Sequence, residues 1–347
     1  MTSNKRISRL AFKAGCVLIG SCLAGSLAGQ TDNANPATIV TFDPPGSAQT
    51  FPEGINSSGV IAGYYYDGVG QYYSFLREPN GTFVIFDVPG AIGTYARSIN
   101  DNGAVAGYYQ TATYPYPQYG FVRGPDGTIA TFNAPGATNT FPYGIDNNGT
   151  AAGSYWDVNG ASHGFLRNAG GELIAFDVPG AGTTSGEGTV AVDINVAGAV
   201  IGYDTGSKSY AFLRVYSGQI VPIDVSGCSV TLPTGINGSG TVTGICAVDG
   251  LNSGFVRALS GESTIYSIPG ANVFSAVINI SGTVAGFYAV GNQPDHGYWR
   301  SAGGTIHSFD PPGSIDTYPA AINNSGTITG SYDDASYGTH GFLISPS

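Results

Sequence analysis

The sequence is 347 residues long, with 54 Gly, 20 Pro and 22 Tyr, and only 10% of its residues are charged. Its formal net charge of −11 at pH 7 argues against binding to nucleic acid or to an anionic membrane, because both would repel it. A chain so rich in Gly is typical of turn-rich β-structure, and no apolar run after residue 28 is long enough to predict a transmembrane segment.

The first 28 residues predict an export signal. They combine a basic start, an apolar stretch and a small-residue cleavage site at Ser26-Leu27-Ala28. Ile19-Gly20-Ser21-Cys22 also fits a lipobox, in which case Cys22 would carry a lipid anchor. Removal of the signal leaves eight basic and 23 acidic residues, a charge of −15. We therefore expect a secreted or cell-surface bacterial protein, with residues 29–37 as a linker.

An internal repeat of about 44 residues covers residues 38–347. Its most regular part is Ile-[Asn/Asp]-x-x-Gly-x-x-x-Gly, with both glycines in every copy. The copies begin at Ile55, Ile99, Ile145, Ile194, Ile236, Ile278 and Ile322. Tandem units of this length are typical of a propeller, in which each unit is one small sheet that cannot bury its faces alone. We predict an all-β fold, a seven-bladed β-propeller of four-stranded antiparallel blades.

Four strand-like runs recur in each unit. In the first unit they are residues 50–56, 60–66, 72–78 and 82–87. Asn56 and Gly59 suit a type I turn closed by a left-handed Gly, and Asn80-Gly81 predicts a two-residue hairpin loop before the fourth run. Pro45-Gly46, in the first Phe-Asp-x-Pro-Gly element, fits the centre of a type II turn that Asp43 can cap.

Proline identifies the two edge strands of each unit, because it cannot donate to a strand ladder. It occurs in one Phe-Asp strand, at Pro222, and in four of the strands that end on the Ile-Asn motif, at Pro52, Pro142, Pro233 and Pro319. The Ile-Asn strand is therefore expected to be innermost and the Phe-Asp strand outermost. The chain ends without a last outermost strand. Residues 38–43 are thus expected to close the last blade beside residues 341–344, in a one-plus-three closure.

The recurring His-Gly-Phe-Leu, Phe-Asp-x-Pro-Gly-Ala and Gly-Ile-Asn elements resemble the HAF-repeat family of bacterial extracellular proteins, named for a His-Ala-Phe core. The likeness covers residues 38–347, with Gly usually in place of Ala. The resemblance implies a secreted, propeller-like repeat protein and supplies no catalytic residues. The His position holds His163, His296 and His340, and in the other copies Tyr73, Tyr119, Tyr210 and Ser253. Since a ring would separate the three histidines, they favour packing or hydrogen bonding over a metal site.

Arginine recurs in one slot of the third strand. The slot holds Arg77, Arg123, Arg167, Arg214, Arg257 and Arg300, with Ile344 in the seventh copy. We expect these structural guanidinium groups to tie neighbouring blades together through carbonyls or carboxylates, because a guanidinium is suited to both. The expected carboxylates are those of Asp43, Asp87, Asp177, Asp224 and Asp310. An anion-binding ring is the alternative.

Motifs of other chemistries are missing from the sequence. It contains no nucleophile elbow, zinc-protease motif or phosphate loop, so no catalytic residue, metal site or cofactor is predicted. Asp146-Asn147-Asn148-Gly149 leaves calcium as an open alternative, although its spacing falls short of a calcium loop. Cys228 and Cys246, the two cysteines after the signal, predict a disulfide in an oxidising compartment, with two buried thiols as the alternative.

The best functional signal lies in the loops between second and third strands. The longest spans residues 109–119, and tyrosines of this loop and of residues 66–72 suit stacking on a sugar or an apolar peptide. The candidate ligand-binding residues are Tyr66, Tyr72, Tyr109, Tyr114, Tyr116 and Tyr119. Alternatively, these side chains merely cover the blades beneath them.

These observations predict a secreted, non-catalytic and monomeric binding or surface-interaction module, with a carbohydrate or peptide ligand on the loop face. One alternative is a polysaccharide-active propeller enzyme, a lyase or glycosidase, which would need a close pair of carboxylates or a His and a Glu facing the channel mouth. Another is a purely structural cell-surface protein.

Overall fold

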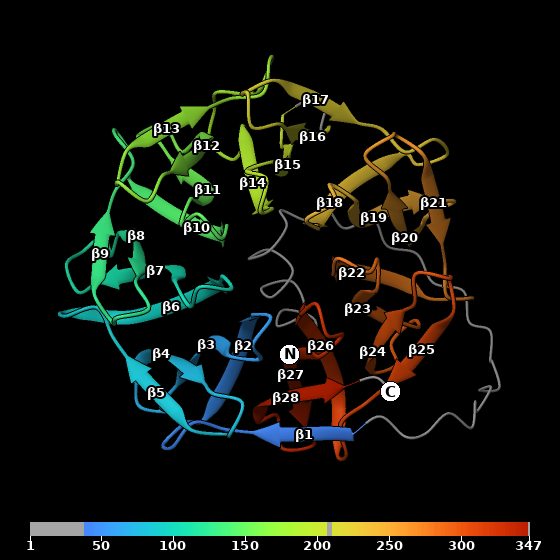
Figure 1. The fold of residues 1–347 in the computed structure, drawn as a ribbon, viewed down its shortest axis with the longest axis horizontal. Coiled ribbons are helices and arrows are strands. Elements are labelled where there is room, and N and C mark those ends of the chain that lie inside the picture. The colour runs from blue at the N-terminus through green and yellow to red at the C-terminus, as the bar shows by residue number, and fades with distance from the viewer. Residues whose placement is uncertain (1–37, 207–209, 346–347) are drawn as a thin grey trace.

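A computed structural model describes residues 38–206 and 210–345 of the protein. The expected signal sequence (1–28), the alternative lipid attachment at Cys22 and the expected linker (29–37) lie outside the described residues. The described residues form strands and turns arranged as a ring (Figure 1), which confirms the all-β prediction.

The strands follow one another in repeating sets of four after an isolated first strand. In chain order they are β1 (Thr38–Phe42); β2 (Gln49–Ile55), β3 (Ile61–Tyr66), β4 (Tyr72–Arg77) and β5 (Phe83–Phe86); β6 (Ala91–Ile99), β7 (Val105–Thr111), β8 (Gln118–Arg123) and β9 (Ile129–Phe132); β10 (Asn139–Ile145), β11 (Ala151–Trp156), β12 (Ser162–Arg167) and β13 (Leu173–Phe176); β14 (Thr189–Ile194), β15 (Val200–Asp204), β16 (Ala211–Arg214) and β17 (Ile220–Ile223); β18 (Val230–Ile236), β19 (Val242–Val248), β20 (Leu251–Arg257) and β21 (Ser263–Tyr266); β22 (Asn272–Ile278), β23 (Val284–Ala289), β24 (Asp295–Arg300) and β25 (Ile306–Phe309); and β26 (Ser314–Ile322), β27 (Ile328–Asp334) and β28 (Thr339–Ser345).

Each set of four consecutive strands, such as β2–β5, pairs in antiparallel fashion and is called a blade here, and so is the last set, β26–β28 together with β1. The sets β10–β13, β14–β17, β18–β21 and β22–β25 are separate four-stranded sheets. The other twelve strands are linked into one sheet by single parallel residue pairs, Gln49 with Thr339 and Tyr72 with Gly93. Strands β2, β6, β10, β14, β18, β22 and β26 surround the axis, and the fourth strand of each blade lies at the rim (Figure 1). The innermost and outermost strands are therefore those that the prolines predict.

The first strand closes the ring. Strand β1 pairs antiparallel with β28, from Thr38 opposite Ser345 to Phe42 opposite Gly341. Phe42 packs edge-on against Phe75 of β4 and so joins the core between the first and last blades. The predicted pairing of the N-terminal strand with the last C-terminal strand is confirmed.

The second glycine of the repeat motif is explained by a bulge in the innermost strand. The pairing of β2 with β3 shifts between Pro52 and Gly54, which brings the main chain of β2 close to Gly63. A Cβ atom on Gly63 would lie 2.3 Å from the carbonyl oxygen of Phe51, far inside contact distance. Only glycine fits there, and the same bulge recurs at Pro142 and Pro233.

The turns before the outermost strands differ from the prediction. In the first blade, Gly81 donates to the carbonyl of Glu78 and Glu78 donates to that of Thr82, the same pattern that Asn56, Gly59 and Val60 make. Only the glycine of the Asn80-Gly81 pair has a positive φ, whereas a two-residue type I′ loop needs two such residues. The predicted two-residue loops are therefore wrong, and both hairpins use a type I turn followed by a left-handed Gly.

The arginine slot connects neighbouring blades through aromatic rings. The Arg77 guanidinium carbon lies 4.8 Å from the ring centre of Phe42 in the preceding blade. Equivalent pairs, at 4.9 to 5.0 Å, are Arg123 with Phe86, Arg167 with Phe132, Arg214 with Phe176, and Arg300 with Tyr266. The weakly hydrated, planar guanidinium is well suited to such a stack.

The predicted aspartate partners of these arginines are wrong. Asp43 accepts hydrogen bonds from the Thr50 hydroxyl and from His340 Nδ1. Asp310 is used in the same way by Thr317 and His296, and Asp177 by His163. Asp43 and Asp310 thus cap their own connectors, and Arg77 instead donates to the main-chain carbonyl of Glu78.

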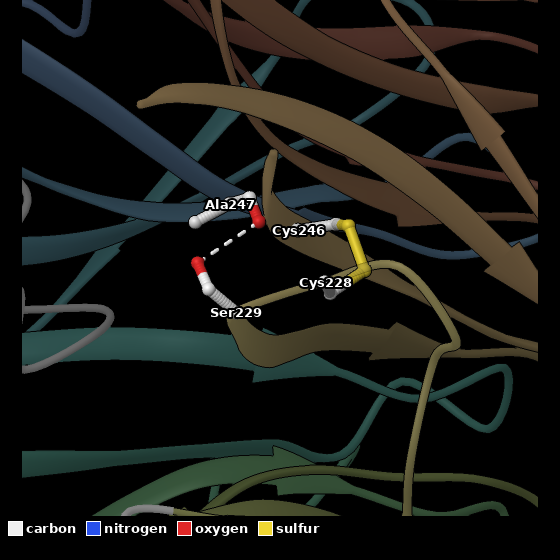
Figure 2. The surroundings of a disulfide bond; sticks show 4 residues. All are labelled: Cys228, Ser229, Cys246 and Ala247. Carbon is white, nitrogen blue, oxygen red and sulfur yellow. Dashed lines mark hydrogen bonds between the residues drawn. A yellow bond between two sulfur atoms is a disulfide. The ribbon is translucent and has the colours of Figure 1, made fainter. Parts of the chain in front are cut away.

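Cys228 and Cys246 form the disulfide that the sequence predicts (Figure 2). Cys228 lies in the connector between β17 and β18, and Cys246 lies on β19. Beside the bridge, Ser229 Oγ donates to the carbonyl of Ala247. The disulfide therefore ties the connector to the second strand of the blade that it enters.

Candidate ligand-binding site

The six predicted tyrosines form three separate pairs. Ring centres are 4.9 Å apart for Tyr66 and Tyr72, 5.9 Å for Tyr109 and Tyr119, and 5.8 Å for Tyr114 and Tyr116. Tyr114 is 82% exposed, and Tyr116 is also exposed. Of the six, only Tyr72 lines the axial cavity described next. The structure thus does not bring the six residues into one site.

The long loop is closed by its own main-chain hydrogen bonds. Thr111 donates to the carbonyl of Pro117, and the main-chain N–H of Tyr116 donates to the carbonyl of Thr113. Tyr109 packs against the core between the first two blades. These contacts fit a cover at the base of the loop, with Tyr114 and Tyr116 projecting at its tip.

A cavity of about 950 Å³ lies along the axis, lined by the innermost strands. One end is bordered by the turns that follow these strands, for example at Asn56 and Ser57. The other end is bordered by strand starts, for example at Gln49, Tyr72 and Asn272. Its volume is within the roughly 300 to 1,000 Å³ of small-molecule sites.

One wall of this cavity, named the tyrosine wall, consists of Phe51, Tyr64, Tyr72, Tyr95 and Tyr108. Phe51 stacks on Tyr64 at 4.9 Å, and Tyr95 stacks on Tyr108 at the same distance. Tyr95 also contacts Tyr64 and Tyr72, each at 5.2 Å. Except for buried Tyr108, these side chains are only partly buried, so the wall presents ring surface to the cavity.

A second aromatic group consists of Phe274, Phe287 and Tyr318. Phe274 stacks on Phe287 at 5.1 Å, and Phe287 meets Tyr318 edge-on at 5.2 Å. Strand β22, which carries Phe274, lies across the axis from β6, which carries Tyr95 (Figure 1). Aromatic surface therefore borders the cavity from two directions.

A buried ion pair sits beside the tyrosine wall. Arg97 Nη1 lies 3.1 Å from Glu53 Oε1, and the two side chains are 4% and 11% exposed. Burial alone would lower the pKa of Arg97, but the charge of Glu53 and the nearby hydroxyls of Tyr108, Tyr64 and Tyr143 outweigh it and raise that pKa. Burial raises the pKa of Tyr95 as well. At neutral pH this wall therefore holds neutral phenols and one internally compensated ion pair.

The sequence reasoning missed Glu53 and Arg97, although a signal was present. They occupy equivalent positions two residues before the Ile of the repeat motif, where Tyr143, Val192 and Thr234 stand in the next units. Opposite charges at one inward-facing position of adjacent units indicate a contact between blades.

The remaining carboxylates of the cavity serve internal contacts. Asp193 accepts from the main-chain N–H groups of Ile194 and Ile236, so it joins neighbouring blades. Asp295 accepts from the Tyr318 hydroxyl at 3.2 Å. Among the residues that the structure describes, five carboxylates and one guanidinium line the cavity, which gives this lining a net negative charge.

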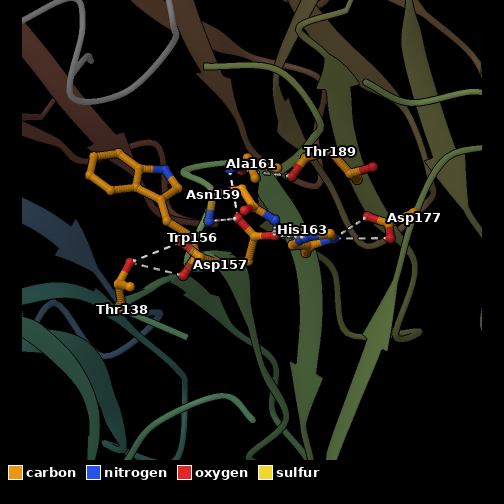
Figure 3. Close-up of polar contacts among 9 residues, drawn as sticks. Thr138, Trp156, Asp157, Asn159, Ala161, His163, Asp177 and Thr189 are labelled. Atoms are coloured by element: carbon orange, nitrogen blue, oxygen red, sulfur yellow. Dashed lines mark hydrogen bonds and ion pairs between the residues drawn. The ribbon is translucent and has the colours of Figure 1, made fainter. Parts of the chain in front are cut away.

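The three histidines of the repeat slot lie in separate blades and outside the cavity. His163 Nδ1 lies 3.0 Å from the carboxylate of Asp177, with Asp157 on its other side (Figure 3). His296 contacts Asp310 and His340 contacts Asp43, each at 2.7 Å. Each His thus ties the third strand of its blade to the end of the fourth, in agreement with a hydrogen-bonding role.

The described part of the chain contains no cluster of three or more metal-ligating side chains, and no helix there could cross a membrane. In the turn considered for calcium, Asp146 Oδ1 accepts from the main-chain N–H groups of Asn148 and Thr150. That carboxylate therefore caps its own turn.

Comparisons with known proteins identify the fold. No family model and no curated protein matches the chain. The structure of streptogramin B lyase is 14% identical with a TM-score of 0.61, over 89% of this chain and 98% of that one. A catalytically inactive virginiamycin B lyase from Staphylococcus aureus with quinupristin is 15% identical, with a TM-score of 0.61 over 89% and 99%. The β-propeller domain of the Trilobed protease from Pyrococcus furiosus is 9% identical, with a TM-score of 0.60 over 86% and 96%. These likenesses show that the chain folds as a β-propeller.

Proposed function

We propose that this protein is a binding module that takes a small ligand into the axial cavity and performs no catalysis of its own. The observation that carries the proposal is the tyrosine wall around the buried Arg97 and Glu53 pair. A concave, largely aromatic site with a few fixed polar groups is the usual form of a small-molecule site. The ion pair can be buried beside these rings because each charge compensates the other, whereas either charge alone would be costly to bury.

The proposed binding site is the axial cavity and not the tip of the long loop. Tyr72 is the one candidate residue common to both. Tyr114 and Tyr116 stand on a single loop, whereas the cavity collects side chains from every innermost strand. A ligand in the cavity would thus contact several blades at once and bury more of its surface.

We further infer a ring of seven blades, with β26–β28 and β1 as the last, and export of the mature protein through the signal in residues 1–28. The repeat count in the sequence and the order of strand pairing support the blade number. The HAF-like repeats and the disulfide support export, since disulfides persist in oxidising compartments. Mass spectrometry of the exported protein tests the signal: an N-terminus at Gly29 is expected, and a lipid-modified Cys22 would contradict cleavage after Ala28.

The binding site is tested by a thermal-shift screen of glycans, short peptides and small aromatic compounds, followed by calorimetry on each ligand found. The variants are Tyr72→Ala in the cavity and, as the matched control, Tyr114→Ala with Tyr116→Ala at the loop tip. We expect Tyr72→Ala to weaken binding at least about tenfold, which corresponds to about 1.4 kcal/mol, and the loop-tip variant to bind normally. Circular dichroism checks that both variants are folded.

The opposite pattern, with binding lost only in the loop-tip variant, would place the site on the loop. Chemical turnover of a bound ligand would replace the binding role with an enzymatic one. Binding to none of the compounds would favour the purely structural alternative.

A further inference from the structure

We propose that the ligand of the axial cavity is a neutral oligosaccharide that stacks on the tyrosine wall, and that Glu53 excludes acidic sugars from it. This inference rests on the proposed binding function and names the ligand class of the same site. It follows from three properties of the cavity: its ring surfaces, its amide and hydroxyl groups, and its charge.

The ring surfaces suit a sugar. A pyranose has an apolar C–H face, which packs on a tyrosine ring while the hydroxyl groups point sideways to polar partners. Tyr64, Tyr72 and Tyr95 provide adjacent, partly exposed rings whose centres lie 5.2 to 6.3 Å apart. Phe274 and Phe287 present further rings from the other side of the axis. A short oligosaccharide would be contacted on both faces.

The polar groups near the rings are mostly uncharged. The amides of Gln49, Gln118 and Asn272 line the end of the cavity where Tyr72 lies, and the hydroxyls of Thr234 and Ser331 line its wall. Amide and hydroxyl groups can both donate and accept, which matches the donor and acceptor character of sugar hydroxyls. Asn272 is held in position because its Oδ1 accepts from the main-chain N–H of Asn252.

The charges disfavour an acidic ligand. Arg97 is the one cation among the described lining residues, and Glu53 lies 3.1 Å from it in a buried position. A ligand carboxylate would have to displace Glu53, and it would also meet the field of Asp193 and Asp295. A cationic ligand would lose hydration at the tyrosine wall without gaining a free counter-charge there, because Arg97 already compensates Glu53. A neutral ligand avoids both costs.

Glu53 is therefore the specificity-determining residue in this proposal. Replacing it by Gln keeps the shape and the hydrogen-bonding capacity of the side chain but leaves the guanidinium of Arg97 without its counter-charge. A sugar carboxylate could then serve as that counter-charge. The double change Glu53→Gln with Arg97→Met removes both charges of the pair and therefore offers no cation to a sugar carboxylate. It is the control for Glu53→Gln and should gain no affinity for an acidic sugar.

The experiment measures calorimetric binding of hexasaccharides to the mature full-length protein. The neutral probes are cellohexaose, maltohexaose, xylohexaose and mannohexaose; hexagalacturonate is the acidic probe and a chitosan hexamer the basic one. We expect at least one neutral probe to bind about tenfold or more tighter than both charged probes. Tyr72→Ala should weaken this binding at least about tenfold, and the loop-tip variant, Tyr114→Ala with Tyr116→Ala, should retain it. Glu53→Gln should gain about tenfold or more in affinity for hexagalacturonate.

Several results would overturn the inference. Tighter binding of an acidic or basic hexamer than of every neutral one contradicts the ligand class. Unchanged discrimination in a folded Glu53→Gln variant contradicts the role of Glu53. Binding of a peptide, lost in Tyr72→Ala, without binding of any hexasaccharide would leave the proposed binding function standing and exclude its saccharide ligand. If no ligand of any class binds in this cavity, both the saccharide ligand and the proposed binding function are excluded.

Discussion

The side-chain amide of Asn323 donates a hydrogen bond to the main-chain carbonyl oxygen of Asn56, which lies 267 residues earlier in the chain. This bond is one of a circle of equivalent bonds around the axis that is interrupted at a single position. In each, the motif Asn donates to the carbonyl of its counterpart in the next blade: Asn56 to Asn100, Asn100 to Asp146, Asn195 to Asn237, Asn237 to Asn279, and Asn279 to Asn323. Asp146 stands at the remaining position, and its carboxylate has no N–H to donate.

The first prediction follows from this break in the circle. Asp146→Asn should add a bond to the carbonyl of Asn195 and raise the free energy of unfolding by about 1 kcal/mol, the usual net value of a buried hydrogen bond. The main-chain caps on Asn148 and Thr150 use Oδ1, which Asn retains, whereas the long 3.4 Å hydrogen bond from Asn148 Nδ2 to Oδ2 is lost. Chemical denaturation measures the change, and Glu262→Gln, on an exposed side chain, controls for the lost negative charge. A stability gain in the control alone, or in neither protein, contradicts the predicted bond.

A second prediction concerns the guanidinium stacks between blades. Arg167 lies over the ring of Phe132, at the end of the outermost strand of the preceding blade. For Arg257 the equivalent position, at the end of β17, holds Ile223, which has no aromatic ring. Arg167→Met should therefore lower the free energy of unfolding by about 0.5 to 1 kcal/mol more than Arg257→Met, because the first loses a cation–π contact together with a hydrogen bond to the carbonyl of Asn168. Both variants keep the packing of the aliphatic stem. Equal losses in the two variants would show that the ring adds nothing beyond packing.

The repeats made most of the fold predictable. Each unit repeats the same sequence pattern, which defines four strands. Because Pro cannot donate to a strand ladder, its positions distinguish edge strands from central ones. The order of strands from axis to rim and the closing role of β1 could therefore be predicted. The partner of Arg77 could not be predicted from the repeat pattern. Its charge suggested Asp43, but that carboxylate is held by Thr50 and His340, and the adjacent Phe42 ring faces the guanidinium.

The site was less predictable for a related reason. Glu53 and Arg97 occur once each, and their contact depends on how two blades are packed, which no periodicity within one unit reveals. The loop tyrosines were more visible in the sequence than those of the tyrosine wall, because loops vary among the units. In the structure, their rings meet in pairs on separate segments, and only Tyr72 reaches the cavity.

A third prediction concerns the ring closure. Deletion of residues 38–43 removes Phe42 from its core and leaves β28 with an unpaired edge. We expect a loss of at least about 3 kcal/mol in the free energy of unfolding, the usual cost of losing a buried Phe, together with aggregation through the open edge. Light scattering and thermal melting measure both effects, with deletion of residues 346–347 as the control. A truncated protein that stays monomeric and melts at the same temperature would falsify the role of β1.

The last prediction is a pH dependence at the same closure, where His340 of β28 lies between Asp43 and Asp334. Partial burial alone would lower the pKa of His340, but the hydrogen bonds and charges of the two carboxylates outweigh it and raise that pKa. A group whose pKa is higher in the folded state stabilises the fold below its unfolded pKa, about 6.5 for His, and this contribution is lost as the pH rises through the folded pKa.

His340→Gln should therefore lower the melting temperature most at about pH 5 to 6, by an amount equivalent to no more than about 1 kcal/mol because the pair is partly exposed. The difference from the wild type should shrink at about pH 8 to 9. His307→Gln is the matched control, because His307 stacks on Trp299 and has no carboxylate partner among the described residues. A His340→Gln effect that is constant from pH 5 to 9 would show that the charge of His340 does not hold β1 in place.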